Sequence, residues 1–100
     1  MQVQITALHD LKLTPAIENH VHKKFAILEK HFNHINRIHV TLSIDNNKSQ
    51  HTAKADLHLV GGKDVVADST TKDMYASIDM LAKTLDEQIK KYKEKLQEKE

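Results

Sequence analysis

The chain has 100 residues, 39% of them hydrophobic and 29% charged, and its 15 basic residues nearly balance its 14 acidic ones. A single domain of this length buries one core and leaves no room for the interdomain cleft of a large enzyme. The absence of cysteine excludes a disulfide framework, a thiol nucleophile and a cysteine-ligated zinc site. Because no apolar stretch approaches the roughly 18 residues of a membrane span, we expect one soluble, cytoplasmic domain over residues 1–100.

The first predicted elements are a strand and an amphipathic helix. Val3, Ile5 and Ala7 alternate with polar residues, which is typical of a strand with one buried face. Thr14 can cap a helix whose first position is Pro15, where a missing N–H costs nothing. The helix should run to about residue 34, because apolar residues recur every three or four positions. These residues are Ile17, Val21, Phe25, Leu28 and Phe32.

The apolar period then becomes alternating, which predicts three more strands over residues 38–44, 52–59 and about 65–69. The polar cluster 45–49 separates the first two, and Gly61 and Gly62 permit the positive φ angles of a tight hairpin between the last two. The small residues of the last strand leave space for a helix to pack. The predicted inward residues are Ile38, Val40, Leu42, Ile44, Ala53, Ala55, Leu57, Leu59, Val65, Ala67 and Ser69.

A second amphipathic helix ends the sequence. Thr70 or Thr71 is its predicted N-cap, with Asp73 at the spacing of a capping box. Its end is polar from about residue 93, and we expect this end to fray. The apolar stripe consists of Ile78, Leu81, Leu85, Ile89, Tyr92 and Leu96.

The predicted element order is β-α-β-β-β-α, which defines an α+β fold. A strand-helix-strand start implies a right-handed parallel crossover, and the remaining strands can pair as hairpins. Both helices should then be packed on one face of a four-stranded sheet, as in a double-stranded-RNA-binding domain.

The sequence offers little to support catalysis. It contains no phosphate-binding glycine loop, no nucleophilic serine elbow and no His-Glu-x-x-His helix. His31 and His34 are three residues apart, but no acidic residue or cysteine at ligand spacing completes a metal site. His39 and His58 should lie on the outward face of adjacent strands, either as solvated residues or as a contact for nucleic acid or for sensing pH.

The charge pattern is more informative than the motifs. At ~100° per residue, Lys23 and Lys30 stack on the first helix with Lys24 on the same flank. On the second helix, Lys83 and Lys90 share one flank and further lysines the other, with acidic residues interleaved. Such a pattern can be an ordinary solvated surface. Lysines on two helices, with aromatic residues mostly in the core, also suit recognition of phosphates and shape in structured RNA.

Five segments carry a further pattern: the opening 1–6, Thr-Pro-Ala-Ile at 14–17, Lys-Phe-Ala-x-Leu-Glu at 24–29, Ala-Asp-Leu-His at 55–58 and Asp-Met-Tyr-Ala-Ser-Ile-Asp at 73–79. In this order they resemble the ribosome hibernation promoting factor family, which includes the ribosome-associated inhibitor Y and the sigma-factor modulation proteins. The resemblance covers nearly the whole chain, and its most specific segment is 73–79.

The resemblance implies a non-enzymatic protein, without cofactor or metal, that binds the small ribosomal subunit in the channel of messenger and transfer RNA. Bound there, it would inhibit translation and preserve inactive ribosomes in stationary phase or stress. Because the chain ends at Glu100, it resembles the short form, which can act with a separate ribosome modulation factor. We expect a monomer when the protein is free.

The family's basic pattern is kept at some positions and lost at others. Lys24 and Lys91 fit it, whereas Ile27, Thr84 and Glu87 depart from it. Neighbouring lysines can supply the missing charge. The predicted RNA-binding residues are therefore Lys23, Lys24, Lys30, Lys83, Lys90 and Lys91.

Two other classes of protein compete with this interpretation. A protein-interaction regulator, acting for example on a transcription factor, would use the exposed sheet around His39, Lys54 and His58. A small-molecule regulatory module would need a ligand pocket, and no phosphate- or carboxylate-binding loop is evident to line one.

Overall fold

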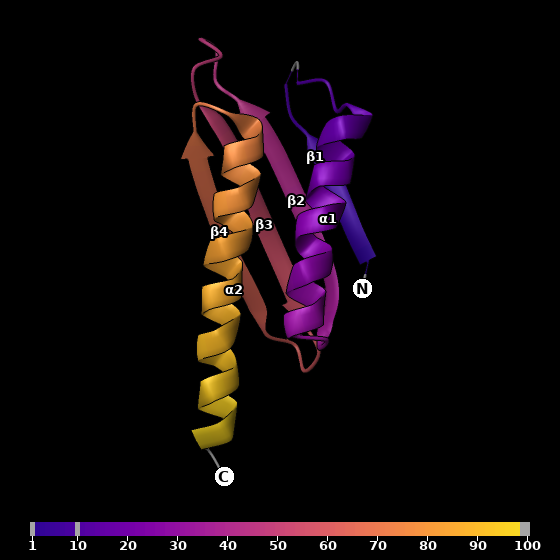
Figure 1. The fold of residues 1–100 in the computed structure, drawn as a ribbon, viewed down its shortest axis with the longest axis vertical. Helices are drawn as coiled ribbons and strands as arrows, with labels where there is room; N and C mark the ends of the chain where they lie inside the picture. Colours follow the sequence, from indigo (N-terminus) through magenta and orange to yellow (C-terminus); the bar gives the residue numbers. More distant parts are fainter. Residues whose placement is uncertain (1, 10, 99–100) are drawn as a thin grey trace.

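A computed structural model describes residues 2–9 and 11–98. Its elements follow in the predicted order: β1 (Gln2–Ala7), α1 (Pro15–His31), β2 (Ile35–Ile44), β3 (His51–Leu59), β4 (Asp64–Thr71) and α2 (Met74–Glu98). The four strands form one sheet, and both helices lie side by side over the same face of it (Figure 1). The predicted fold class is thereby confirmed.

The sheet has the strand order β1-β2-β3-β4. β1 runs parallel to β2, with Ile5 opposite Val40, so α1 is the crossover between two parallel neighbours. The other two pairs are antiparallel, as expected for hairpins. This topology leaves the opposite face of the sheet uncovered by either helix.

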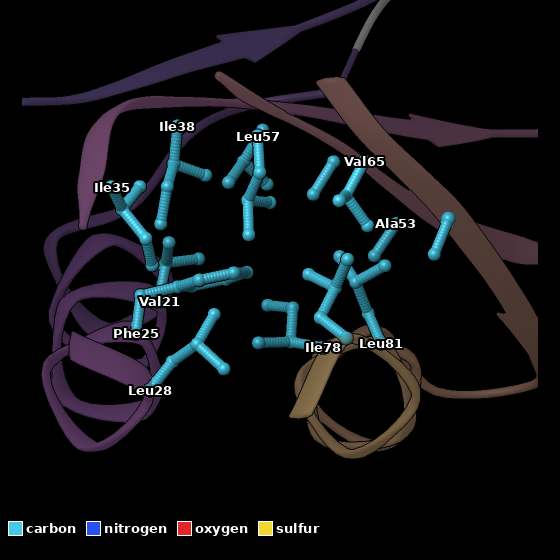
Figure 2. Packing of buried hydrophobic residues seen from close by; sticks show 14 of the residues in the cluster. Val21, Phe25, Leu28, Ile35, Ile38, Ala53, Leu57, Val65, Ile78 and Leu81 are labelled. Atoms are coloured by element: carbon cyan, nitrogen blue, oxygen red, sulfur yellow. The ribbon is translucent and has the colours of Figure 1, made fainter. Parts of the chain in front are cut away.

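The core lies between the helices and the sheet. The predicted stripe of α1 is buried from Ile17 to Phe32. On α2 the stripe residues are buried up to Ile89, and Tyr92 is half-buried. The buried stripe residues of α2 are Ile78, Leu81, Leu85 and Ile89. Figure 2 shows Val21 and Phe25 of α1 pointing towards Ile38 and Leu57 of the sheet. Leu96 was predicted to continue the stripe, but its side chain is outside the described part of the structure.

The conformations of both loops between antiparallel strands are explained by residues within the loops themselves. Gly61 and Gly62 have φ angles of 101° and 92°, a region that other residues rarely adopt, which confirms the predicted hairpin. In the loop 45–50, the backbone N–H groups of Gln50 and Ser49 donate to the Asp45 carboxylate at 2.9 and 2.8 Å. The hydrogen bond from Gln50, followed by those from Ser49, holds the pKa of Asp45 below its usual value.

The first helix is shorter than predicted and β2 is longer. α1 ends at His31, because Phe32 has extended backbone angles although its N–H still bonds the carbonyl of Leu28. β2 begins at Ile35 rather than at the predicted Ile38. A register shift between Ile35 and Arg37 interrupts the apolar alternation at the start of this strand. Two inward residues three positions apart were therefore not recognised as one strand.

The predicted cap of the second helix, Thr70 or Thr71, is wrong by three or two residues. Thr71 is the last residue of β4, and Asp73 caps α2 by accepting a hydrogen bond from the Ala76 N–H at 3.3 Å. The helix continues through Glu98, so residues 93–98 are helical in the structure. Fraying of this end stays a prediction.

Ser77, in the first turn of α2, connects this helix with β3 and β4. It is fully buried, and its hydroxyl donates to the carbonyl of His51 at 2.6 Å while accepting from the Thr71 N–H at 3.1 Å. The same oxygen lies 2.8 Å from the Thr71 hydroxyl. One small side chain thus connects α2 with the paired ends of β3 and β4.

We predict that Ser77→Ala lowers the free energy of unfolding by about 1–3 kcal/mol, because it leaves the partly buried His51 carbonyl and Thr71 N–H without the serine partner. Urea denaturation followed by circular dichroism measures this change. Ser69→Ala, a half-buried serine of β4, is the matched control and should change stability by less than about 0.5 kcal/mol. Equal effects of the two substitutions would show that the Ser77 hydroxyl does not link these elements.

Candidate nucleic-acid interface

The helical face, meaning the surface of α1 and α2 directed away from the sheet, carries most of the predicted lysines. Lys23 and Lys30 are exposed on α1, opposite its buried stripe. Lys83 and Lys90 are exposed on α2 on the side of that helix nearest α1. Lys24 lies between the helices, where it contacts Asp79 of α2. Five of the six predicted residues are therefore on the helical face or between the helices.

Lys91 does not join this group. It lies on the opposite flank of α2, in a shallow hollow against the edge of β4 that it shares with Lys63, Tyr92 and Lys95. The Lys63 ammonium stands 5.4 Å from the centre of the Tyr92 ring. The structure thus separates the predicted lysines into a set of five between and above the helices and one at the sheet edge.

The acidic residues of α2 that face α1 are paired with basic groups. Asp79 Oδ1 lies 2.7 Å from His20 Nε2 and 3.4 Å from Lys24 Nζ. These contacts join residues of two helices that are far apart in the sequence. As a result, the negative charge of Asp79 is partly neutralised before any partner arrives.

A second carboxylate repeats this arrangement two turns further along α2. Asp86 Oδ1 lies 2.8 Å from His31 Nδ1, and Asp86 Oδ2 lies 3.5 Å from Lys90 Nζ. Lys93 Nζ also donates to the carbonyl of His31 at 3.1 Å, which satisfies a backbone group at the end of α1. The sequence predicted these acids only as interleaved charges, because the periodicity of α2 alone does not show which of its flanks faces α1.

The surroundings of Asp86 act on its pKa in opposite directions. Partial burial raises the pKa, but the hydrogen bond and positive charge of His31, together with Lys90, outweigh burial and place the pKa below 3.8. Because the pKa of Asp86 is lower in the folded protein than in the unfolded chain, ionised Asp86 stabilises the fold at pH values above its pKa in the unfolded chain. This contribution is lost as pH falls through the folded pKa.

We predict that His31→Ala raises the pKa of Asp86, because the substitution removes both the hydrogen bond and the charge that favour the carboxylate. Carboxyl carbon chemical shifts followed by NMR between pH 2 and 6 measure the change. Lys30→Ala, at the exposed neighbouring position, is the control and should leave the titration in place. An unchanged Asp86 curve in His31→Ala would contradict the assigned cause.

A hollow of about 200 Å³ opens between the two helices. Ile27, Leu28 and Ala82 supply its apolar wall, and Lys24 and Lys83 both border it. Asp79, Asp86 and His31 complete the lining. Two predicted lysines are therefore brought together at one depression, which neither helix forms alone.

The sheet face, on the opposite side of the molecule, is polar and mixed in charge. It holds a hollow of about 370 Å³, whose lining includes Arg37, His39, Asp56 and His58. His58 Nδ1 lies 2.6 Å from Asp64 Oδ1, and His39 Nε2 lies 2.9 Å from the Thr6 hydroxyl. The outward position predicted for both histidines is confirmed, and whether they serve a contact stays open.

Neither a metal-ligand cluster nor a membrane-spanning helix occurs in the described part of the chain. No three His, Asp or Glu side chains there are grouped as metal ligands. None of the described helices is long and apolar enough to cross a membrane.

The structure defines a small α+β domain whose helical face carries lysines together with exposed acidic residues such as Glu87 and Glu94. The family model described as "Sigma 54 modulation protein / S30EA ribosomal protein" matches residues 3–97, and the chain belongs to this family.

Individual relatives agree with this assignment. The ribosome hibernation promoting factor of Azotobacter vinelandii is 42% identical over 95 residues, which is 95% of this chain and 85% of that protein. The factor of the same name from Escherichia coli strain K12 is 40% identical over 98 residues, which is 98% of this chain and 99% of that protein. The structure of a ribosomal subunit interface protein from Coxiella burnetii matches with a TM-score of 0.84 at 28% identity, covering 93% of this chain and 98% of that one.

Proposed function

We propose that the protein is a non-enzymatic ribosome hibernation factor of the cytoplasm. It binds the small ribosomal subunit in the channel of messenger and transfer RNA and thereby inhibits translation. Ribosomes held in this state are inactive and preserved through stationary phase or stress. The free protein is a monomer, and a separate ribosome modulation factor can join it where ribosomes dimerise.

The observation that carries this proposal is the gathering of lysines on the helical face of a chain whose relatives are ribosome hibernation promoting factors. Ammonium groups at the ends of long side chains are suited to phosphates, which are the repeating feature of any RNA surface. The two helices hold these groups on a rigid support, because their opposite sides are fixed in the core.

The paired carboxylates strengthen this electrostatic argument. Asp79 and Asp86 lie within a face that has to approach polyanionic RNA, and an unpaired carboxylate there would oppose binding. Their contacts with His20, Lys24 and His31 reduce that cost. The sheet face also presents acidic residues, Asp56 and Asp64, and Asp64 is paired with His58 in the same way. We favour the helical face as the RNA contact because it carries five of the six predicted lysines.

The direct test is co-sedimentation of the purified protein with separated small and large ribosomal subunits at increasing salt. We expect pelleting with the small subunit that weakens steeply as salt rises, because each lysine–phosphate contact releases counterions. Pelleting that is absent at low salt, or equal with both subunits, would contradict the proposal.

A charge reversal on the helical face tests the contact surface. We predict that the triple variant Lys23→Glu, Lys30→Glu and Lys83→Glu weakens binding and reduces the slope of log affinity against log salt by about three. Lys24 is left unchanged, because a glutamate at this position would face Asp79 and disturb the helix pair. Co-sedimentation over a salt series measures both quantities, and circular dichroism verifies the fold.

The matched control reverses the same number of charges elsewhere. Lys12, Lys48 and Lys54 are exposed in two loops and on the sheet face, and their replacement by glutamate changes the net charge by the same amount. The control should retain a steeper salt dependence and tighter binding than the first variant. Equal losses in the two variants would show that net charge, rather than the helical face, governs binding.

A further inference from the structure

One apolar side chain interrupts the basic helical face. Ile27 is 44% exposed, although it lies between Lys24 and Lys30 on α1. Its side chain borders the hollow between the helices, where Leu28 and Ala82 continue the apolar surface inward. In a face proposed to meet RNA, an apolar side chain has nothing to offer a phosphate but can pack against the ring of a base.

The other lining residues also disfavour phosphate inside the hollow. Asp79 and Asp86 both contribute to it, and the hydrogen bond and charges around Asp86 keep its pKa low and therefore keep the group ionised. Two carboxylates repel a phosphate anion but accept hydrogen bonds from an uncharged group that carries N–H donors. A nucleobase offers an apolar ring face and, in three of the four RNA bases, an exocyclic amino group.

The rim of the hollow has the opposite character. Lys24 and Lys83 border it from the two helices, so their ammonium groups can hold the phosphates on either side of a base. The volume of about 200 Å³ suits a single heterocyclic base rather than a helix or a strand of another protein. Single unstacked bases are what proteins recognise most readily in folded RNA.

We propose that the hollow between α1 and α2 binds one unstacked, amino-bearing RNA base, with Ile27 against the ring and a carboxylate of Asp79 or Asp86 accepting the amino group. This inference rests on the proposed function, since it assigns a base contact within the same RNA-binding face. It also gives Ile27, which departs from the family's basic pattern, a role in recognition. Uracil lacks the amino group and should be the poorest occupant.

The first experiment compares two exposed apolar residues on the ribosome. Ile27→Ala should weaken binding to the small subunit about tenfold, as expected for the loss of one base contact, with an unchanged salt slope. Met80→Ala is the control, because Met80 is 52% exposed on α2 and does not border the hollow. Equal affinities of the two variants would overturn the base site while leaving salt-dependent pelleting of the unchanged protein, and hence the proposed function, intact.

The second experiment needs no ribosome. The δ1 methyl signal of Ile27 is followed by NMR while hexamers of cytidine, adenosine or uridine nucleotides are added at low salt. We expect the cytidine and adenosine hexamers to shift this signal, through the ring current of the bound base, more than the uridine hexamer does. Equal shifts with all three, or no shift at concentrations that move the lysine signals, would overturn the proposal.

Discussion

The arrangement of the functional surface depends on two amphipathic helices burying their apolar stripes against the same face of one sheet. Small side chains at Ala53, Ala55 and Ala67 lie on the inner face of β3 and β4 and allow α2 to approach closely. Larger residues such as Phe25 fill the space under α1. Once these contacts are made, the rotation of each helix about its axis is fixed. The side of the helix from which each exposed lysine projects is therefore fixed as well.

The contacts between the helices serve electrostatics as well as stability. Pairs such as His20 with Asp79 and His31 with Asp86 are partly exposed and contribute modestly to folding. They also act on the field above the helices, because they hold two acidic groups of α2, Asp79 and Asp86, close to basic groups of α1. Basic groups such as Lys23 and Lys30, which face outward, are then the ones that a polyanion meets first.

The elements of the fold could be predicted because each has a regular apolar period. The stripe of α1 and the alternation in β3 were recognised correctly, whereas the start of β2 was not, because a bulge places Ile35 and Ile38 on the same side. The cap of α2 depends on one hydrogen bond at Asp73, and several nearby residues could have made an equivalent bond.

The candidate site was less predictable than the fold. The periodicity of one helix shows which lysines share a flank but does not show how two helices are aligned along their axes. The pairing of Asp86 with His31 and the hollow beside Ile27 both depend on that alignment. Lys91 was included in the predicted set because it fits the family's basic pattern, although the flank of α2 that carries it faces β4.

The length of α2 has a mechanical consequence. Its 25 residues extend about 37 Å at the usual rise of the α-helix, and Figure 1 shows the helix continuing past the end of the sheet. The described part of the molecule is accordingly 50 Å long but only 21 by 20 Å across. If the compact end is anchored and this segment stays helical, the rod places Lys95 at a second, distant point of the same partner. Even weak contacts there would oppose tilting of the domain about its anchored end, because they act on a long lever arm.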